Sequence, residues 1–272
     1  MVLLEELRRR AGADVVVTGA GVVGFETTDH SATVILEDGP RVEGKVAIAA
    51  DGIHSAIRRQ MVPKEGEPIW NGAIMWRGTT PGVPIRSGAS FVGVGSLRHR
   101  VVLYPISPPD PATGLATINW IAEITVDNAT GWTQGDWNRR VDLADFIGHF
   151  EDWNYGWLDV PAMLRGATEV FEYPMIDRDP VPTWQDGPVA LLGDAAHPML
   201  QYLAQGACMA MEDAVTLGQA LKKFDNDFLQ AFELYQRSRV ARTARIVLSS
   251  REMGRIYHAK GVERLVRNDL WK

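Results

Sequence analysis

The 272-residue sequence has one cysteine, no long hydrophobic run and no excess of positive charge, and each lack excludes a class of protein. Cys208 alone cannot build a disulfide framework or an all-cysteine zinc site, so we expect the reducing cytoplasm. No apolar stretch reaches the roughly 18 residues of a membrane-spanning helix, and the first residues lack the apolar core of a signal peptide. The net charge of −6 argues against binding to nucleic acid or to an anionic membrane.

Motifs for several common catalytic sites are also lacking. The six histidines show no paired metal-ligand spacing, so we predict no metal site. The sequence has no G-x-S-x-G motif for a nucleophilic serine. The run Gly19 to Gly24 does fit G-x-G-x-x-G, but the residues that follow it lack a helical apolar stripe. We therefore interpret this run as a glycine-rich hairpin.

What the sequence does contain is the composition of a folded protein with about two domains: 46% apolar and 23% charged residues. An α/β pattern occupies both ends of the chain, and the middle carries strand-like runs separated by loops rich in proline and glycine. This order predicts an α/β domain split in sequence, with a mixed or antiparallel β-sheet domain inserted into it. We place the parts at residues 1–63, 64–178 and 179–272.

The α/β parts have recognisable elements. A short amphipathic helix ends at Gly12, and Val15–Val17 and Ala32–Leu36 are typical of strands. Residues 46–50 are small and apolar throughout, which predicts a strand buried on both faces of a parallel sheet. Helices are expected from about 206 to 222 and, as a long closing helix, from about Phe228 to Tyr257.

Two acidic residues follow predicted buried strands in the two α/β parts. Asp51 opens the pattern D-G-x-x-S-x-x-R, which ends at Arg58. The second acid, Asp194, follows Gly193 and precedes a loop and the predicted helix from Gly206. A carboxylate at a strand end can accept hydrogen bonds from sugar or ribityl hydroxyls, and a helix N-terminus favours an anionic ligand edge. The pattern predicts a cofactor site that both acids share.

These motifs resemble those of the FAD-dependent aromatic hydroxylases of the para-hydroxybenzoate hydroxylase type, the class A flavoprotein monooxygenases. Asp51-Gly52 is similar to their second motif, and the run from Gly193 to Pro198 with Ala204 to Ala207 is similar to their third. Residues Met75 to Gly78 and Tyr173 to Pro180 are similar to the phenazine-pathway branch of the family. The resemblance covers nearly the whole chain.

The resemblance implies a glutathione-reductase-like FAD/NAD(P)-binding fold whose flavin carries the chemistry. NADH or NADPH would reduce the FAD, oxygen would add at flavin C4a, and the hydroperoxide would hydroxylate a small aromatic or N-heteroaromatic ring. No side chain is expected to be an essential acid–base catalyst. The implied FAD-binding residues are Asp51, Gly52, Arg58, Gly193, Asp194, Ala204, Gln205, Gly206 and Ala207.

Two residues are candidates for contact with the substrate. Tyr104 lies on a strand expected to face the cavity, although a core tyrosine fits equally well. Gln201 stands where many relatives of this type have proline, so it brings an amide to the loop beside flavin and substrate.

One part of the family pattern is not found. The family opens on a βαβ unit with a true G-x-G-x-x-G, and this sequence matches only from the helix before the second motif. We therefore expect an N-terminally truncated domain. Two alternatives stay open: a truncated, non-catalytic remnant of such an enzyme, and a flavin oxidoreductase of the same fold that does not use oxygen.

Overall fold

The computed structural model describes residues 2–95, 97–126, 139–225 and 227–270. The contacts divide the chain into two compact units. The first unit comprises Met1–Pro68, Arg178–Met199 and Ala204–Val247, and the second comprises Ile69–Asp177, Leu200–Leu203 and Leu248–Lys272. The second unit therefore includes two segments, 200–203 and 248–272, that the sequence placed with the α/β part.

The first unit begins with the expected short helix, α1 (Val2–Ala11), which ends where Gly12 adopts a φ of 96°. The strand predicted at Val15–Val17 is wrong. These residues form the end of a single 3-10 turn and an extended stretch, and Val17 is 79% exposed. A β-branched run becomes a strand only beside a partner, and this one pairs with no strand of the described ranges.

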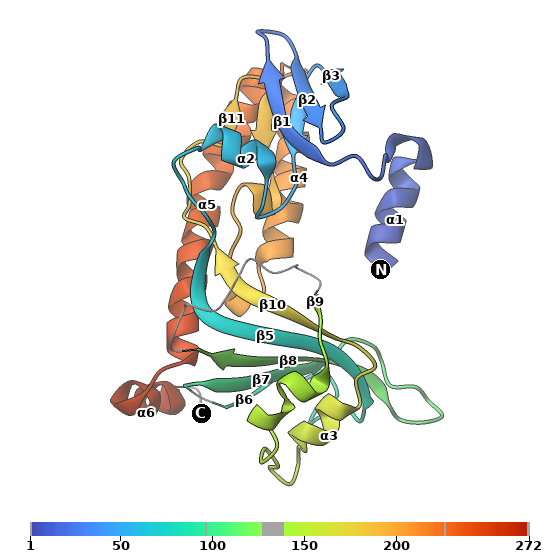
Figure 1. The fold of residues 1–272 in the computed structure, drawn as a ribbon, viewed down its shortest axis with the longest axis vertical. Helices are drawn as coiled ribbons and strands as arrows, with labels where there is room; N and C mark the ends of the chain where they lie inside the picture. Colours follow the sequence, from blue (N-terminus) through green and yellow to red (C-terminus); the bar gives the residue numbers. More distant parts are fainter. Residues whose placement is uncertain (1, 96, 127–138, 226, 271–272) are drawn as a thin grey trace. The chain divides into compact units, whose positions relative to one another are not determined.

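An antiparallel sheet of three strands follows α1 (Figure 1): β1 (Val22–Thr27), β2 (Ala32–Leu36) and β3 (Arg41–Gly44). The glycine-rich run thus opens no helix and leads into β1, the first arm of a hairpin whose turn lies at residues 28–31. Phe25 and Ala32 point into the core of the unit, at 3% and 2% exposure. On the solvent side, Glu26 and Arg41 form an ion pair.

A second small sheet contains the parallel pair that the sequence pattern predicts. Its strand order is β11 (Gln185–Asp186), β12 (Val189–Leu191) and β4 (Ala47–Ala49), and β12 and β4 run parallel. All three residues of β12 are fully buried, but Ile48 in β4 is 42% exposed. The prediction that this strand is buried on both faces is therefore wrong for Ile48, because the face of β4 that carries Ile48 is open to solvent.

Three helices complete this unit: α2 (Ala56–Met61), α4 (Gly206–Lys223) and most of α5 (Phe228–Tyr257). The helical spacing in the sequence predicted the bounds of α4 and α5 to within a residue. Phe232 and Tyr235 of α5 pack with β12 in the core of the unit, and both are fully buried.

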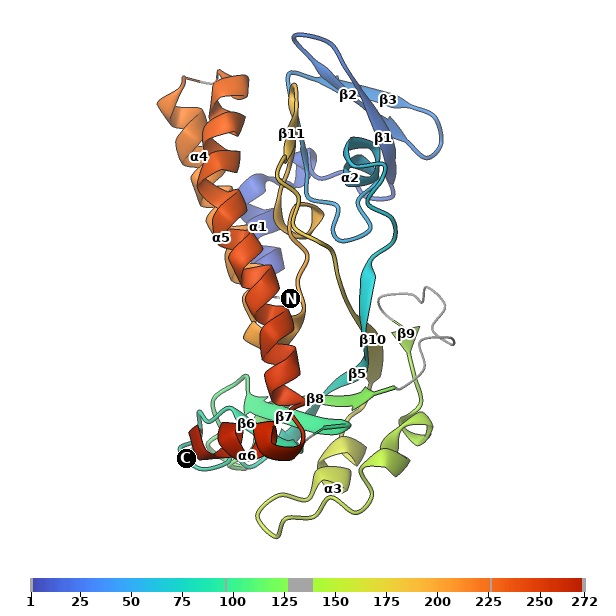
Figure 2. The ribbon, with the colours of Figure 1, turned by 90° about the vertical axis from the view of Figure 1, so that its left-hand side faces the viewer.

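The second unit contains a six-stranded sheet in which every neighbouring pair is antiparallel, so the predicted inserted sheet is confirmed. Figure 2 shows the central strands and α3 (Val160–Arg165), and α6 (Gly261–Leu270) closes the chain. In spatial order the strands are β6 (Val92–Gly95), β7 (His99–Pro105), β8 (Ala116–Thr125), β5 (Ile69–Gly82), β10 (Val170–Asp177) and β9 (Arg139–Arg140).

The two faces of this sheet belong to different apolar clusters, because successive side chains of a strand point to opposite faces. One cluster joins Trp76, Leu103 and Trp120 of the sheet to Leu164 in α3 and to Phe146, which precedes α3 in the sequence. The other joins Ala73, Met75 and Met175 to Leu200 and Tyr202. None of the helices in the described ranges is long and apolar enough to cross a membrane.

Candidate functional site

Asp51 and Asp194 follow two strands that lie side by side. In the parallel pair of β4 and β12, Ala49 is opposite Leu191, and the Leu192 N–H donates to the Ala49 carbonyl oxygen over 2.8 Å. The carboxyl ends of both strands therefore share one edge of the sheet, which is where ligands of such sheets bind. Segments far apart in the sequence meet at this edge, as the strand pattern predicted.

The residues after β4 form a tight turn into α2. Gly52 has a φ of 80°, a left-handed conformation that glycine adopts without strain. Asp51 Oδ2 accepts the Ala56 N–H at 3.0 Å, and Ser55 Oγ accepts the Arg58 N–H at 2.9 Å. Asp51 and Ser55 thus satisfy free amides at the start of α2, and the Asp51 side chain remains exposed.

Asp194 has a different environment. Solvent reaches its side chain, yet no residue in the described part of the chain donates a hydrogen bond to its carboxylate. Protein atoms crowd the other sides, and this burial raises the pKa of the Asp194 carboxyl against the opposing effect of His197. A β-carbon placed on Gly206 would lie 4.0 Å from Asp194 Oδ1. The carboxylate is therefore an acceptor without a donor, close to the start of α4.

The loop that carries Asp194 is fixed by a buried group that we call the Asp213 cluster: Asp213, His197 and Arg239. The fully buried carboxylate of Asp213 accepts the Gly193 N–H at 3.1 Å and contacts His197 Nε2 at 2.5 Å. Arg239 Nε donates to its other oxygen at 2.7 Å. Gly193 itself has a φ of 62°, and a β-carbon there would lie 3.3 Å from Ala210 Cβ. The backbone on both sides of Asp194 is therefore fixed.

The sequence pattern identified the motif from Gly193 to Pro198 with Ala204 to Ala207, but it did not identify Asp213 as the residue that fixes the loop. The sequence does carry a signal for this role of Asp213. The buried positions of α4 are Met209, Asp213, Leu217 and Ala220, so an acid occupies an apolar helical stripe. An acid at such a position needs a partner, because an unpaired buried charge is strongly unfavourable.

The N-terminus of α4 follows a strained residue. Ala204 has a φ of 52°, which is unusual for a residue with a β-carbon. Gln205 precedes the helix and makes no side-chain capping hydrogen bond. The first N–H groups of an 18-residue helix, near Gly206 and Ala207, therefore lack a side-chain acceptor. This arrangement favours a negatively polarised ligand edge.

The structure does not support the prediction that Arg58 contacts the cofactor. Arg58 is 1% exposed, and protein oxygens occupy all five of its N–H donors. Its Nη1 donates to the carbonyls of Ala195 and Ala196 at 3.0 and 2.6 Å. Its remaining donors reach the Glu65 carboxylate and the Asp179 carbonyl. Arg58 therefore fastens the loop after Asp194 instead of presenting a cation to a ligand.

The two substrate candidates both belong to the second unit. The half-buried ring of Tyr104 stacks on Phe91, with centroids 5.5 Å apart. Gln201 donates its side-chain N–H to the sulfur atoms of Met75 and Met175. Leu103 lies in the cluster near α3, so the alternation along β7 directs Tyr104 to the face that also carries Met75. Contact of either residue with a substrate stays a prediction.

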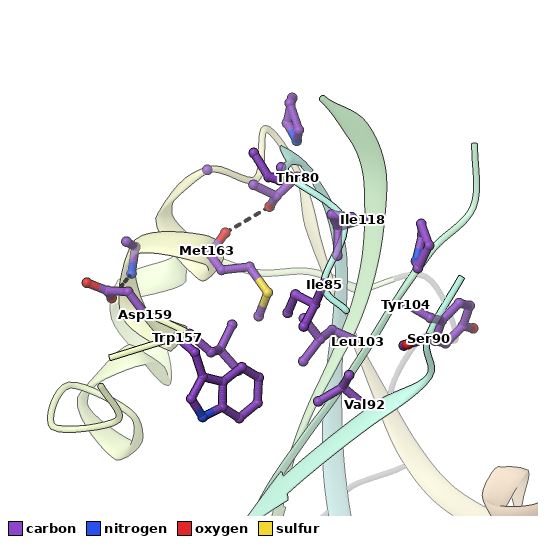
Figure 3. Close-up of a pocket in the computed structure, with 17 residues that line it drawn as sticks. Thr80, Ile85, Ser90, Val92, Leu103, Tyr104, Ile118, Trp157, Asp159 and Met163 are labelled. Carbon is purple, nitrogen blue, oxygen red and sulfur yellow. Dashed lines mark hydrogen bonds between the residues drawn. The ribbon is translucent and has the colours of Figure 1, made fainter. Parts of the chain in front are cut away.

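A cavity of about 350 Å³ lies in the second unit (Figure 3). Leu103, Ile118, Trp157 and Met163 line it, which places it largely on the α3 side of the sheet. Figure 3 shows the Tyr104 ring beside Ser90, away from Trp157 and Met163. Thr80, a polar residue that lines the cavity, already donates its hydroxyl to the Met163 carbonyl at 2.8 Å. Ser90, Tyr104 and Asp159 also line the cavity, but most of its apolar lining lies on the sheet face opposite Met75, the contact of Gln201.

No group of three or more possible metal ligands occurs among the residues that the structure describes. The single cysteine, Cys208, is exposed in the first turn of α4.

Comparisons with known proteins agree with the geometry. A family described as FAD binding domain matches residues 171–248. The chain is 41% identical to 3-hydroxybenzoate 6-hydroxylase of Polaromonas naphthalenivorans, over 94% of this chain and 61% of that protein. It is 40% identical to 3-hydroxybenzoate 6-hydroxylase 2 of Aquipseudomonas alcaligenes, over 94% of this chain and 76% of that protein.

A phenazine 1,6-dicarboxylic acid hydroxylase of Lysobacter antibioticus is 38% identical, over 93% of this chain and 63% of its own length, in line with the predicted phenazine-branch likeness. Among solved structures, Klebsiella pneumoniae HpxO complexed with FAD and uric acid matches with a TM-score of 0.79 at 25% identity. That match covers 99% of this chain and 65% of HpxO. The chain thus spans less than two thirds of several of the proteins that it matches.

Proposed function

This chain belongs to the FAD-dependent aromatic hydroxylases, and we propose that it takes part in the NAD(P)H- and oxygen-dependent hydroxylation of a small aromatic or N-heteroaromatic ring. The observation that carries the proposal is the Asp194 carboxylate, an acceptor without a donor beside the open N-terminus of α4. The names of the relatives support an aromatic acid as the substrate class. The cytoplasm stays the predicted compartment, on the single cysteine alone.

The residues present fit FAD. Asp194 would accept hydrogen bonds from ribityl hydroxyls, which would compensate the desolvation that raises its pKa. Gly193 and Gly52 would allow the ligand to approach the backbone, and Asp51 would lie toward the pyrophosphate. The segment Ala204–Ala207 would present helix N–H groups to the polar edge of the flavin ring. When bound, FAD supplies the redox chemistry and the activation of oxygen.

The protein side chains would then position the ring that is hydroxylated. The Tyr104 hydroxyl and the Gln201 amide would orient a substrate by hydrogen bonds, and Gln201 is held by the sulfur atoms of Met75 and Met175. These hydrogen bonds would decide which ring atom is presented for hydroxylation. Neither Tyr104 nor Gln201 is required as an acid or base.

A titration with FAD tests the proposal on the full chain. We expect the flavin fluorescence to change on binding, and Asp194→Asn to raise the dissociation constant at least about tenfold, because one charged acceptor is lost. The matched control is Asp186→Asn, an exposed acid of the same unit, which should leave the constant unchanged. Equal affinities for all three proteins would contradict the assignment of Asp194.

A second assay separates the alternatives. With FAD, NADH or NADPH and an aromatic acid such as 3-hydroxybenzoate, oxygen uptake should match the hydroxylated product one to one. Reduction of the aromatic compound without oxygen uptake would favour an oxidoreductase. Flavin binding without turnover of any aromatic acid would favour a non-catalytic remnant.

A further inference from the structure

The segment Leu200–Leu203 lies between Asp194 and α4 in the sequence. By its contacts it belongs to the second unit, although Met199 and Ala204 on either side belong to the first. Four residues so placed need contacts that fix them to the sheet of the second unit. Tyr202 supplies several of these contacts: its side chain is 6% exposed and touches three different elements of that unit.

The hydroxyl of Tyr202 makes two hydrogen bonds. It donates to Glu123 Oε1 on β8 at 2.7 Å and accepts from Asn71 Nδ2 on β5 at 3.0 Å. Burial and the charge of Glu123 raise the pKa of Tyr202, so the hydroxyl keeps its proton and acts as a donor. Gly254 on α5 packs against the ring, and a β-carbon there would lie 2.5 Å from Tyr202 Cε2. The ring and the hydroxyl are therefore both held.

Glu123 is the centre of what we call the Glu123 cluster: Glu123, Arg100, Tyr202 and His258. Glu123 is 1% exposed, and its carboxylate contacts Arg100 Nη2 at 3.1 Å and His258 Nε2 at 3.0 Å. Burial acts to raise the pKa of Glu123, but His258, Arg100 and Tyr202 outweigh it and the pKa is lowered. The acceptor of the Tyr202 hydrogen bond is therefore an anion, and charge-assisted hydrogen bonds are among the stronger ones.

Arg100 and His258 also contact aromatic rings at the cluster. The Arg100 guanidinium carbon lies 5.1 Å from the centroid of the Tyr202 ring and 4.1 Å from that of Tyr257. His258 Nδ1 lies 2.8 Å from the Gly254 carbonyl oxygen, so its Nε2 is directed back to Glu123. Tyr202 is thus held between β8, β7 and the end of α5.

The strained residue Ala204 is two positions after Tyr202. A left-handed conformation of a residue with a β-carbon costs about 1 kcal/mol or more and persists only where its surroundings impose it. The firmly held Tyr202 and the first turn of α4 are the two fixed points on either side of Ala204. If Tyr202 were released, Ala204 could relax and the backbone at Gln205 and Gly206 could turn.

We propose that Tyr202 is a positioning residue. Through its hydrogen bond to the Glu123 cluster it sets the backbone of Ala204–Ala207, the segment that the proposed function assigns to the polar edge of the flavin ring. The inference rests on that proposed function for the ligand, but the anchoring of the segment is independent of any ligand. Tyr202 acts through backbone geometry and need not touch the flavin.

Hydrogen exchange followed by mass spectrometry tests the anchoring on the full chain without ligand. Tyr202→Phe removes the hydroxyl and keeps the ring. We expect exchange in the peptide covering 203–210, which includes the Met209 N–H bonded to the Gln205 carbonyl, to accelerate about tenfold. Tyr155→Phe, at an exposed tyrosine of the same unit, is the matched control and should change nothing there. Unchanged exchange in Tyr202→Phe would overturn the proposal.

A second variant and a spectroscopic readout separate positioning from a merely structural role. Glu123→Gln keeps an acceptor for the hydroxyl but removes the charge, so its acceleration should be smaller than that of Tyr202→Phe. In titrations with FAD, Tyr202→Phe should alter the absorption spectrum of the bound flavin and weaken binding, and Tyr155→Phe should not. A normal spectrum and affinity despite faster exchange would also overturn the proposal. Failure of the wild-type chain to bind FAD would instead contradict the proposed function and leave the exchange result to decide the anchoring.

Discussion

The segment from Gly193 to Gly206 is fastened at one end by the Asp213 cluster and near the other by the Glu123 cluster, and the two are built differently. Asp213 accepts a backbone N–H, and all three guanidinium nitrogens of Arg239 find acceptors: Asp213, Glu212 and the Met209 carbonyl. Arg100 instead donates to Glu123 through Nη2 and stacks on two rings, and its buried Nε and Nη1 find no acceptor in the described ranges.

This difference indicates two ways of holding a loop. The Asp213 cluster fixes the backbone itself with directional hydrogen bonds, so the loss of one partner leaves several groups unsatisfied. The Glu123 cluster fixes the Tyr202 side chain, whose ring also lies against the Arg100 guanidinium. This cation–π contact is less directional than a hydrogen bond, so it remains when a hydrogen bond of the cluster is lost. We therefore expect the first cluster to be the more sensitive to substitution, and the second to be the more sensitive to pH.

The largest effect is expected for Asp213→Ala. It leaves the buried Arg239 cation without its main partner, and such a loss costs about 3–5 kcal/mol. Urea denaturation followed by circular dichroism measures the free energy of unfolding. Glu233→Ala, which removes an exposed ion pair with Arg237, is the control and should cost less than about 1 kcal/mol. Similar costs for the two variants would remove the basis of the comparison.

Acid should weaken the Glu123 cluster. The pKa of Glu123 is lowered in the folded state, so its contribution to stability is complete above the ordinary value of 4.5 and is lost as the pH falls through the lower folded value. Glu123→Gln should therefore make the unfolding free energy less dependent on pH below 4.5, at a cost of about 1–3 kcal/mol at neutral pH. An identical acid profile for the wild type and Glu123→Gln would show that other carboxylates determine it.

The two clusters also mark what the sequence could predict. Two members of the Asp213 cluster, His197 and Asp213, lie in a loop and a helix that are adjacent along the chain, and only Arg239 comes from a more distant helix, α5. The ends of β4 and β12 were predicted to meet because buried strands in an α/β pattern pair in parallel. Members of the Glu123 cluster come from four segments between Arg100 and His258, and no local pattern connects them.

The errors have the same physical origin. Val15–Val17 has strand propensity, but a strand needs a neighbour that the local sequence does not reveal. Arg58 lies in a motif, but the motif does not show whether a guanidinium points to a ligand or to the protein, and here it binds carbonyl oxygens. Strongly periodic helices such as α5 were predicted with correct bounds because 30 residues carry the same signal.

The smallest effects are expected at two glycines at opposite ends of the fastened segment. Gly193→Ala should cost about 1–2 kcal/mol, because Gly193 has a φ of 62° and the added β-carbon would press on Ala210 at 3.3 Å. Gly206→Ala meets only ordinary contacts, at 3.9 Å from Met199 and 4.0 Å from Asp194, and should be neutral or stabilising by up to about 1 kcal/mol.

If the proposed site is correct, stability and FAD binding respond differently to Gly206→Ala. Gly206→Ala should weaken FAD binding although the protein is no less stable, because the added methyl group fills the space next to Asp194 that a ligand would occupy. Thermal unfolding and an FAD titration of both variants measure the two quantities on the same samples. Tight FAD binding by Gly206→Ala would place the flavin elsewhere. A loss of affinity only in proportion to lost stability would mean that both glycines serve the fold alone.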